Sequence, residues 1–179
     1  MENLSAPAVF KAIEAEVPED FGLLPYVEPW ADANGNVTAL TAKYSEEETS
    51  EGITWHTEWF LTDFSPNGEI LNSAEIPVQM EQVFTGAVTD TAVYLAESMT
   101  GCTRIVRYDR ETKELTSTGD GSDFFGRGDY ALQALSTDEN GFLYCTDTES
   151  LIVLNPDLSE GCDMYPVFWT IFMDKIIIP

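Results

Sequence analysis

The feature that most constrains this chain is an internal repeat of about 45 residues. Three segments share one order, in which an apolar strand is followed by a polar turn and a new strand, and their first strands end at Phe64, Tyr108 and Leu154. Tyr108 lies 44 positions after Phe64, and Leu154 lies 46 positions after Tyr108. A single small sheet cannot cover both of its apolar faces, so a repeat of this kind predicts sheets that stack on their neighbours. A second series of β-rich segments accompanies the first, at residues 35–40, 91–96 and 141–146.

Strand signals dominate the chain, and helical periodicity is almost absent. Short runs of β-branched and aromatic residues are bounded by turn sequences at residues 34–35, 66–68 and 140–141. Apolar residues and glutamates alternate at residues 13–17, which indicates a further strand over 10–18. We therefore predict an all-β fold with antiparallel strands. The predicted strands lie at residues 37–42, 55–64, 69–76, 92–96, 104–108, 114–118, 131–136, 142–146 and 151–154.

A period near 45 with about four short strands per unit resembles the blade of a β-propeller. The resemblance covers residues 10–166 and is generic to WD40-, NHL- and YVTN-like repeats, because the Trp-Asp and Gly-His signatures of WD40 blades are missing. It implies antiparallel four-stranded blades in about three repeats. The expected divisions are an outer strand, three repeats and a partial repeat, at residues 10–18, 22–77, 78–120, 124–166 and 167–179.

Three repeats are fewer than the roughly four to eight blades of a closed propeller. Two arrangements stay open at this point. The chain is part of a larger propeller whose missing blades belong to a longer protein, or a fourth partial repeat closes a very small ring. The start at an outer-type strand and the abrupt apolar end at residues 176–179 favour the first arrangement, an incomplete ring.

The charge of the chain argues against several kinds of partner. There are 32 Asp and Glu against 8 Lys and Arg, a net charge of −24, which repels nucleic-acid phosphates and anionic membrane surfaces and otherwise keeps the protein soluble. Five of the eight basic residues fall between Arg104 and Arg127, which favours local ion pairing over a patch for an anionic ligand. No stretch approaches the about 20 apolar residues of a membrane span, and residues 1–9 do not resemble a signal peptide.

The three cysteines, Cys102, Cys145 and Cys162, form a poor disulfide framework because their number is small and odd. One bridge, with Cys145 and Cys162 as the pair nearest in sequence, and three buried free thiols are both open alternatives. No pair has the close spacing of a zinc knuckle.

Carboxylates at short spacing give the candidate cation sites. Asp120, Asp123 and Asp129 could supply oxygens to Ca²⁺, which takes about six to eight of them; no other cofactor is expected. This segment and a similar one at residues 32–36 do not fit the EF-hand loop, and both are also typical of Asx turns. The glutamates at 46–48 and 51 predict a solvated acidic loop, with a cation site as the alternative.

Four further motifs favour structural roles. Residues 52–55 (Gly-Ile-Thr-Trp) resemble the end of an Asp-box, a folding turn of sialidase-like propellers. His56 is the only histidine and no nucleophile motif accompanies it. Trp55 and Trp59 lie four apart on one strand face, where core packing is favoured over stacking on a sugar ring. The Arg-Gly-Asp tripeptide at 127–129 arises often by chance and does not by itself indicate an integrin ligand.

Together these features predict a non-catalytic binding or scaffold module of propeller type, whose protein or small-molecule ligand the sequence does not identify. Acidity, few lysines and the resemblance to secreted propellers favour an extracytoplasmic or secreted bacterial protein, such as a solute-binding protein. The rival hypothesis is part of a glycan-processing, sialidase-like enzyme, which needs an arginine cluster, a nucleophilic tyrosine and a neighbouring acid. Arg104, Arg107 and Arg110 lie too close along one strand and turn to form that cluster from separate blades.

Overall fold

The fold was determined as a computed structural model. All of its regular elements are strands, and the described part of the chain has no helix, which confirms the predicted all-β class. The described strands do not close into a ring. The predicted strand at 10–18, apart from Pro18, and the partial repeat at 167–179 lie outside the described residues. The structure describes residues 18–19, 21–24, 26–50, 52–78, 80, 83–99, 102–118, 134–146, 150–159 and 165–166.

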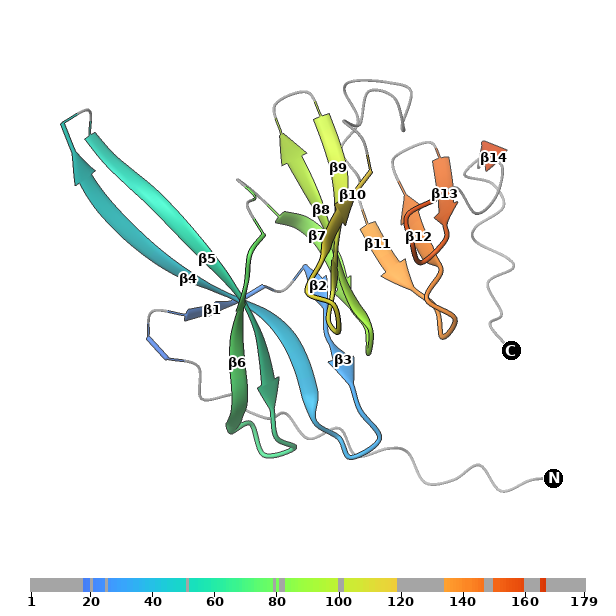
Figure 1. The fold of residues 1–179 in the computed structure, drawn as a ribbon, viewed down its shortest axis with the longest axis horizontal. Helices are drawn as coiled ribbons and strands as arrows, with labels where there is room; N and C mark the ends of the chain where they lie inside the picture. The colour runs from blue at the N-terminus through green and yellow to red at the C-terminus, as the bar shows by residue number, and fades with distance from the viewer. Residues whose placement is uncertain are drawn as a thin grey trace.

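The strands form three sheets that lie one beside the next (Figure 1). The first sheet has the order β1-β4-β5-β6, and β3 pairs with the same strand, β4, as β1 does. Its strands are β1 (Phe21–Leu23), β3 (Trp30–Ala31), β4 (Val37–Thr49), β5 (Gly52–Phe64) and β6 (Ile70–Ile76).

The second and third sheets repeat the antiparallel path. The second has the order β10-β9-β8-β7-β2, in which only the β2–β7 pair is parallel, and the third has the order β11-β12-β13-β14. The second sheet comprises β2 (Val27–Glu28), β7 (Val83–Val88), β8 (Ala92–Met99), β9 (Cys102–Asp109) and β10 (Leu115–Ser117). The third comprises β11 (Ala134–Thr137), β12 (Leu143–Thr146), β13 (Ser150–Leu154) and β14 (Tyr165–Pro166).

The sequence repeat maps onto equivalent strands of the three sheets. Phe64, Tyr108 and Leu154 lie at or next to the ends of β5, β9 and β13, each of which has an antiparallel partner on both sides. The second series lies on or just before β4, β8 and β12, the strands that pair with them. All nine strands predicted in this part of the chain are present, so the repeat signal identified the order of the strands correctly.

Turns of the same construction join equivalent strands. The carboxylate of Asp32 accepts hydrogen bonds from the backbone N–H of Asn34 and Asn36, at 2.8 and 2.9 Å. The carboxylate of Asp138 accepts the equivalent two hydrogen bonds, from the backbone N–H of Asn140 and Phe142, both at 2.9 Å. The Asx-turn interpretation of residues 32–36 is therefore confirmed.

The second sheet is buried on both faces because its neighbours stack against it. Successive side chains of a strand point to opposite faces. Val93 and Leu95 of β8 accordingly pack in one core with residues of the first sheet such as Leu61, whereas Tyr94 packs in a second core with residues of the third sheet such as Leu143. The predicted mutual covering of stacked sheets is thus present in the described strands.

Polar contacts also join neighbouring sheets. The phenol of Tyr94 donates to the carbonyl oxygen of Pro156 across the second interface, at 2.9 Å. Arg110 belongs to the turn after β9, yet its guanidinium lies over the Trp30 ring at 5.5 Å and donates to Thr38 of the first sheet at 3.4 Å. The apolar cores bury the faces of the sheets, and these polar contacts hold neighbouring sheets in a defined relative position.

Candidate binding site

A two-stranded hairpin projects far beyond the first sheet. β4 and β5 pair without interruption from Val37 and Phe64 to Thr49 and Gly52, but β1 follows β4 only as far as Lys43 and β6 follows β5 only from Trp59. The remaining part, residues 44–49 of β4 and 52–58 of β5, has none of the other described strands beside it and extends away from the three sheets (Figure 1). We call this part the arm.

One face of the arm continues the apolar face of the first core. Ala42 and Trp59 lie opposite each other in that core, with exposed fractions of 0% and 4%. The side chains two, four and six positions further along each strand lie on the same face, and three of them are large and apolar. They are Tyr44, Ile53 and Trp55, and their exposed fractions are 52%, 61% and 65%.

Two glutamates share this face with the exposed aromatic residues. Glu46 lies directly opposite Trp55, and Glu48 lies directly opposite Ile53. Directly opposite residues of an antiparallel pair project from the same face of the ribbon. The face therefore carries a column of apolar side chains along β5 beside a column of carboxylates along β4, with Tyr44 at its base. We call it the arm face.

The opposite side of the arm is polar, and two of its side chains lie close together. The ring Nε2 of His56 lies 3.0 Å from Oε2 of Glu47, and both side chains are more than half exposed. Alternation along β4 also separates Glu47 from Glu46 and Glu48. The prediction of an acidic loop at 46–48 is therefore wrong, because these residues lie in a strand; Glu51 lies outside the described residues.

The tryptophans divide between core and surface. Trp59 is buried, as predicted, and its indole N–H has no hydrogen-bond partner among the residues that the structure describes. Core packing was wrong for Trp55, which is the most exposed apolar residue of the arm. The strand-face argument was correct, but the first core ends between the two residues, a boundary that periodicity does not reveal. The Gly-Ile-Thr-Trp sequence begins β5 directly after the turn.

The three described arginines of the basic cluster all donate to nearby acceptors. Arg104 donates to the carboxylate of Glu97, which is buried. Arg107 donates to Asp109 at 2.7 Å, and Arg110 donates to a backbone carbonyl at 2.6 Å. Local ion pairing is thus confirmed for Arg104 and Arg107. The three guanidinium groups have different partners and do not form a carboxylate-binding cluster.

The Asp109 turn gives a pH-dependent prediction. Hydrogen bonds from the backbone N–H of Thr112 and from Arg107 lower the pKa of Asp109 from 3.8 to about 2. A carboxylate with a lowered folded-state pKa stabilises the fold above its unfolded pKa, and this contribution is lost as the pH falls from about 4 to 2. We expect Asp109→Asn to lower stability at pH 7 and to reduce the stability lost over that interval, as measured by urea unfolding at several pH values. Glu111→Gln, an exposed change in the same turn, should leave that interval unchanged; equal effects would contradict the assignment.

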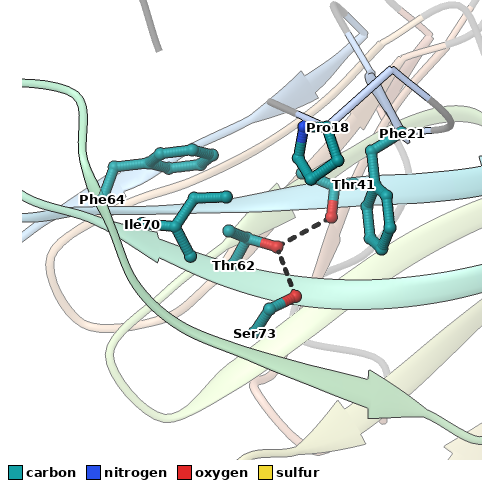
Figure 2. A pocket seen from close by; sticks show the side chains of 7 residues that line it. All are labelled: Pro18, Phe21, Thr41, Thr62, Phe64, Ile70 and Ser73. Carbon is teal, nitrogen blue, oxygen red and sulfur yellow. Dashed lines mark hydrogen bonds between the residues drawn. The ribbon is translucent and has the colours of Figure 1, made fainter. Parts of the chain in front are cut away.

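A small cavity lies on the outer face of the first sheet (Figure 2). Its volume is about 60 Å³, well below the several hundred Å³ of pockets that bind metabolites. Thr62 lies 2.8 Å from Thr41 and 3.0 Å from Ser73, hydroxyl oxygen to hydroxyl oxygen, so these groups satisfy one another. We assign the cavity a packing role. Its other lining residues are Pro18, Phe21, Phe64 and Ile70.

A larger open cleft of about 240 Å³ lies where the segment after β6 meets β9 and β10. Pro77 and Val78 form one side, and Arg104, Val106 and Leu115 line the other. Because Arg104 already donates to the buried Glu97, the cleft offers an anionic ligand little uncompensated positive charge.

The predicted Ca²⁺ ligands Asp120, Asp123 and Asp129 lie outside the described residues, as does the rest of the Arg-Gly-Asp tripeptide. Within the part of the chain that is described, no group of three or more His, Cys, Asp or Glu side chains could hold a metal ion. The alternative of a cation site at residues 46–48 has no support in this arrangement, because alternation divides the glutamates between two faces.

Cys145 is a free thiol in the second core and is fully buried. Burial raises its pKa to about 12, so almost no reactive thiolate exists at neutral pH. We expect iodoacetamide to leave Cys145 unmodified in the native protein and to modify it completely in denaturant, as measured by mass spectrometry of the peptide that contains it. Modification of the native protein at the rate of a model thiol would contradict its burial. Cys162, the proposed bridge partner, lies outside the described residues.

The chain matches no protein-family model and no curated protein. Among the described residues there is also no helix of the length and apolarity needed to cross a membrane.

Proposed function

We propose that the chain is a non-catalytic binding module of propeller type, in which stacked sheets hold the arm out as a docking element for another polypeptide. The observation that carries the proposal is the exposure of Trp55, at 65%, on a hairpin whose base is paired within the first sheet. Large aromatic residues are enriched where proteins bind each other, and a group of exposed apolar side chains marks an interaction site more often than a purely structural surface.

The propeller component rests on the repeat. Each of the three sheets has a run of four strands that pair antiparallel in succession, β4 to β6 with β3, β7 to β10, and β11 to β14. Up-and-down sheets stacked face to face are the architecture of propeller blades. We extend the proposal to an extracytoplasmic bacterial protein with further blades, on the strength of the net charge of −24 and the resemblance to secreted propellers.

The arm also runs against the local preferences of its sequence. Glutamate is depleted in strands, yet β4 continues through three successive glutamates, and an isolated two-stranded ribbon is marginally stable. Departures from local preference tend to occur at functional sites. A purely structural role would not require a hairpin that extends past the ends of β1 and β6 and carries both glutamates and exposed apolar side chains.

Selection from a random peptide library displayed on phage tests this proposal. We expect peptides that bind the intact chain and lose binding to the double variant Tyr44→Ser/Trp55→Ser. That variant should keep the melting temperature of the parent, because both side chains are more than half exposed. Recovery only of peptides that bind the parent and the variant equally, or of none, would overturn the docking role of the arm.

A further inference from the structure

The arm face combines two chemical features that together define a partner. Its apolar column consists of Ile53 and Trp55, and its acidic column consists of Glu46 and Glu48, one strand away. Residues two apart along a strand are spaced by about 6.6 Å. A partner that fills this face needs basic groups and apolar surface that repeat at this spacing.

We propose that the arm face binds a cationic, amphipathic segment of a partner protein, in an extended conformation. This inference rests on the proposed docking role of the arm and specifies the partner. Arginine satisfies both columns, since its guanidinium bonds a carboxylate with two donors and stacks on an indole ring. In an extended segment every second side chain lies on the same face, so arginines at alternate positions reach the arm face together, and their aliphatic stems would cover Ile53 and Trp55.

The exposed backbone of the arm favours an extended partner. Beyond Lys43 and Trp59, β4 and β5 pair only with each other among the described strands, so no described strand occupies the outer edge of either one. An extended peptide can add to such an edge through main-chain hydrogen bonds while its alternate side chains determine specificity. A helix could offer the same columns but could not use these edge groups.

The charge of the chain argues against the other occupants of such a face. A second copy would bring a second net charge of −24 and would place Glu46 and Glu48 against carboxylates of the same kind, with like-charge repulsion. Anionic lipid and nucleic acid are disfavoured for the same reason. The polar side of the arm is a weaker candidate, because Glu47 there already meets His56 at 3.0 Å.

A direct binding experiment tests the partner class. The probe is a labelled synthetic peptide in which arginine alternates with valine, and fluorescence anisotropy measures its binding to the full chain. We expect Glu46→Gln/Glu48→Gln and Trp55→Ser each to weaken binding by roughly tenfold or more, since charged and aromatic contacts at the centre of an interface dominate affinity. Binding should also weaken as salt is added.

The matched control is Glu47→Gln/Glu58→Gln, which removes the same charge from the other side of the same hairpin. It should change affinity by less than about twofold. Equal losses from the two double variants, or equal binding of a peptide with glutamine in place of arginine, would overturn the inference. If the phage selection yields peptides that depend on the arm but lack basic residues, the docking role stands and only the cationic partner is wrong.

Discussion

Tyr94→Ala is expected to lower the free energy of unfolding by about 3–5 kcal/mol, the range found when large aromatic residues are removed from cores. Tyr94 is 1% exposed and is among the largest fully buried side chains. It lies in β8 at the centre of the second core, where it meets side chains of the third sheet. Its hydroxyl also donates to the carbonyl oxygen of Pro156, in the turn after β13 of the third sheet. The substitution therefore weakens the interface between the second and third sheets in two ways.

The loss of stability should be greatest in the third sheet. We expect native-state hydrogen exchange to show the largest loss of protection in β12 and β13, and a smaller loss in β4 and β5, because the first sheet packs in a different core. Tyr94→Phe keeps the ring and removes only the hydroxyl, so it should cost about 1 kcal/mol. If Tyr94→Ala unfolded with the stability of the parent, the third sheet would not be held by this interface.

Gly86→Ala is expected to lower the free energy of unfolding by about 1–3 kcal/mol, the usual cost of overpacking a core. Gly86 lies in β7 between β2 and β8. A methyl group added there would lie 2.5 Å from the carbonyl oxygen of Tyr94 and 2.9 Å from a methyl carbon of Leu95. The nearer atom belongs to the backbone, so the clash cannot be relieved by a new rotamer and the strands must separate.

Gly22→Ala is the matched control for this change. Gly22 also lies in a strand, and its added methyl group would first meet the far edge of the Tyr44 ring at 3.2 Å. That ring is half exposed and can move, so thermal and urea unfolding should show a change below about 0.5 kcal/mol. Equal destabilisation by the two substitutions would mean that alanine is unfavourable at strand positions of this protein in general. The close approach at Gly86 would then not be the cause.

The sequence predicted the strand order well because the signal for a strand is local. Alternation and turn residues are both contained in a few neighbouring positions, and the turns at Asn34 and Asn140 formed as the residues indicated. The strand β7 was not predicted, although its apolar residues are consistent with one. The pairing of β2 with β7 could not be predicted, because two residues carry no periodicity and the partner is distant in the chain.

The site was harder to predict for a related reason. Three successive glutamates at 46–48 indicate a loop by propensity, but the register that begins at Val37 and Phe64 continues through them. Whether Trp55 is core or surface depends on where the neighbouring sheet ends, and that is a property of the assembled fold. The exposure of an aromatic residue can therefore be determined only from the structure, whereas the glutamates near it can be read from the sequence.

The position of β2 has a consequence for how this protein can be divided. The chain leaves β1 in the first sheet, adds Val27 and Glu28 to the edge of the second, and returns to the first at β3. A cut at residues 77–78, where the repeat places a boundary, would separate β2 from β7 and expose the edge that it covers. The first two sheets should accordingly melt as one cooperative unit, and a fragment carrying either of them alone is expected to be a poor autonomous folder.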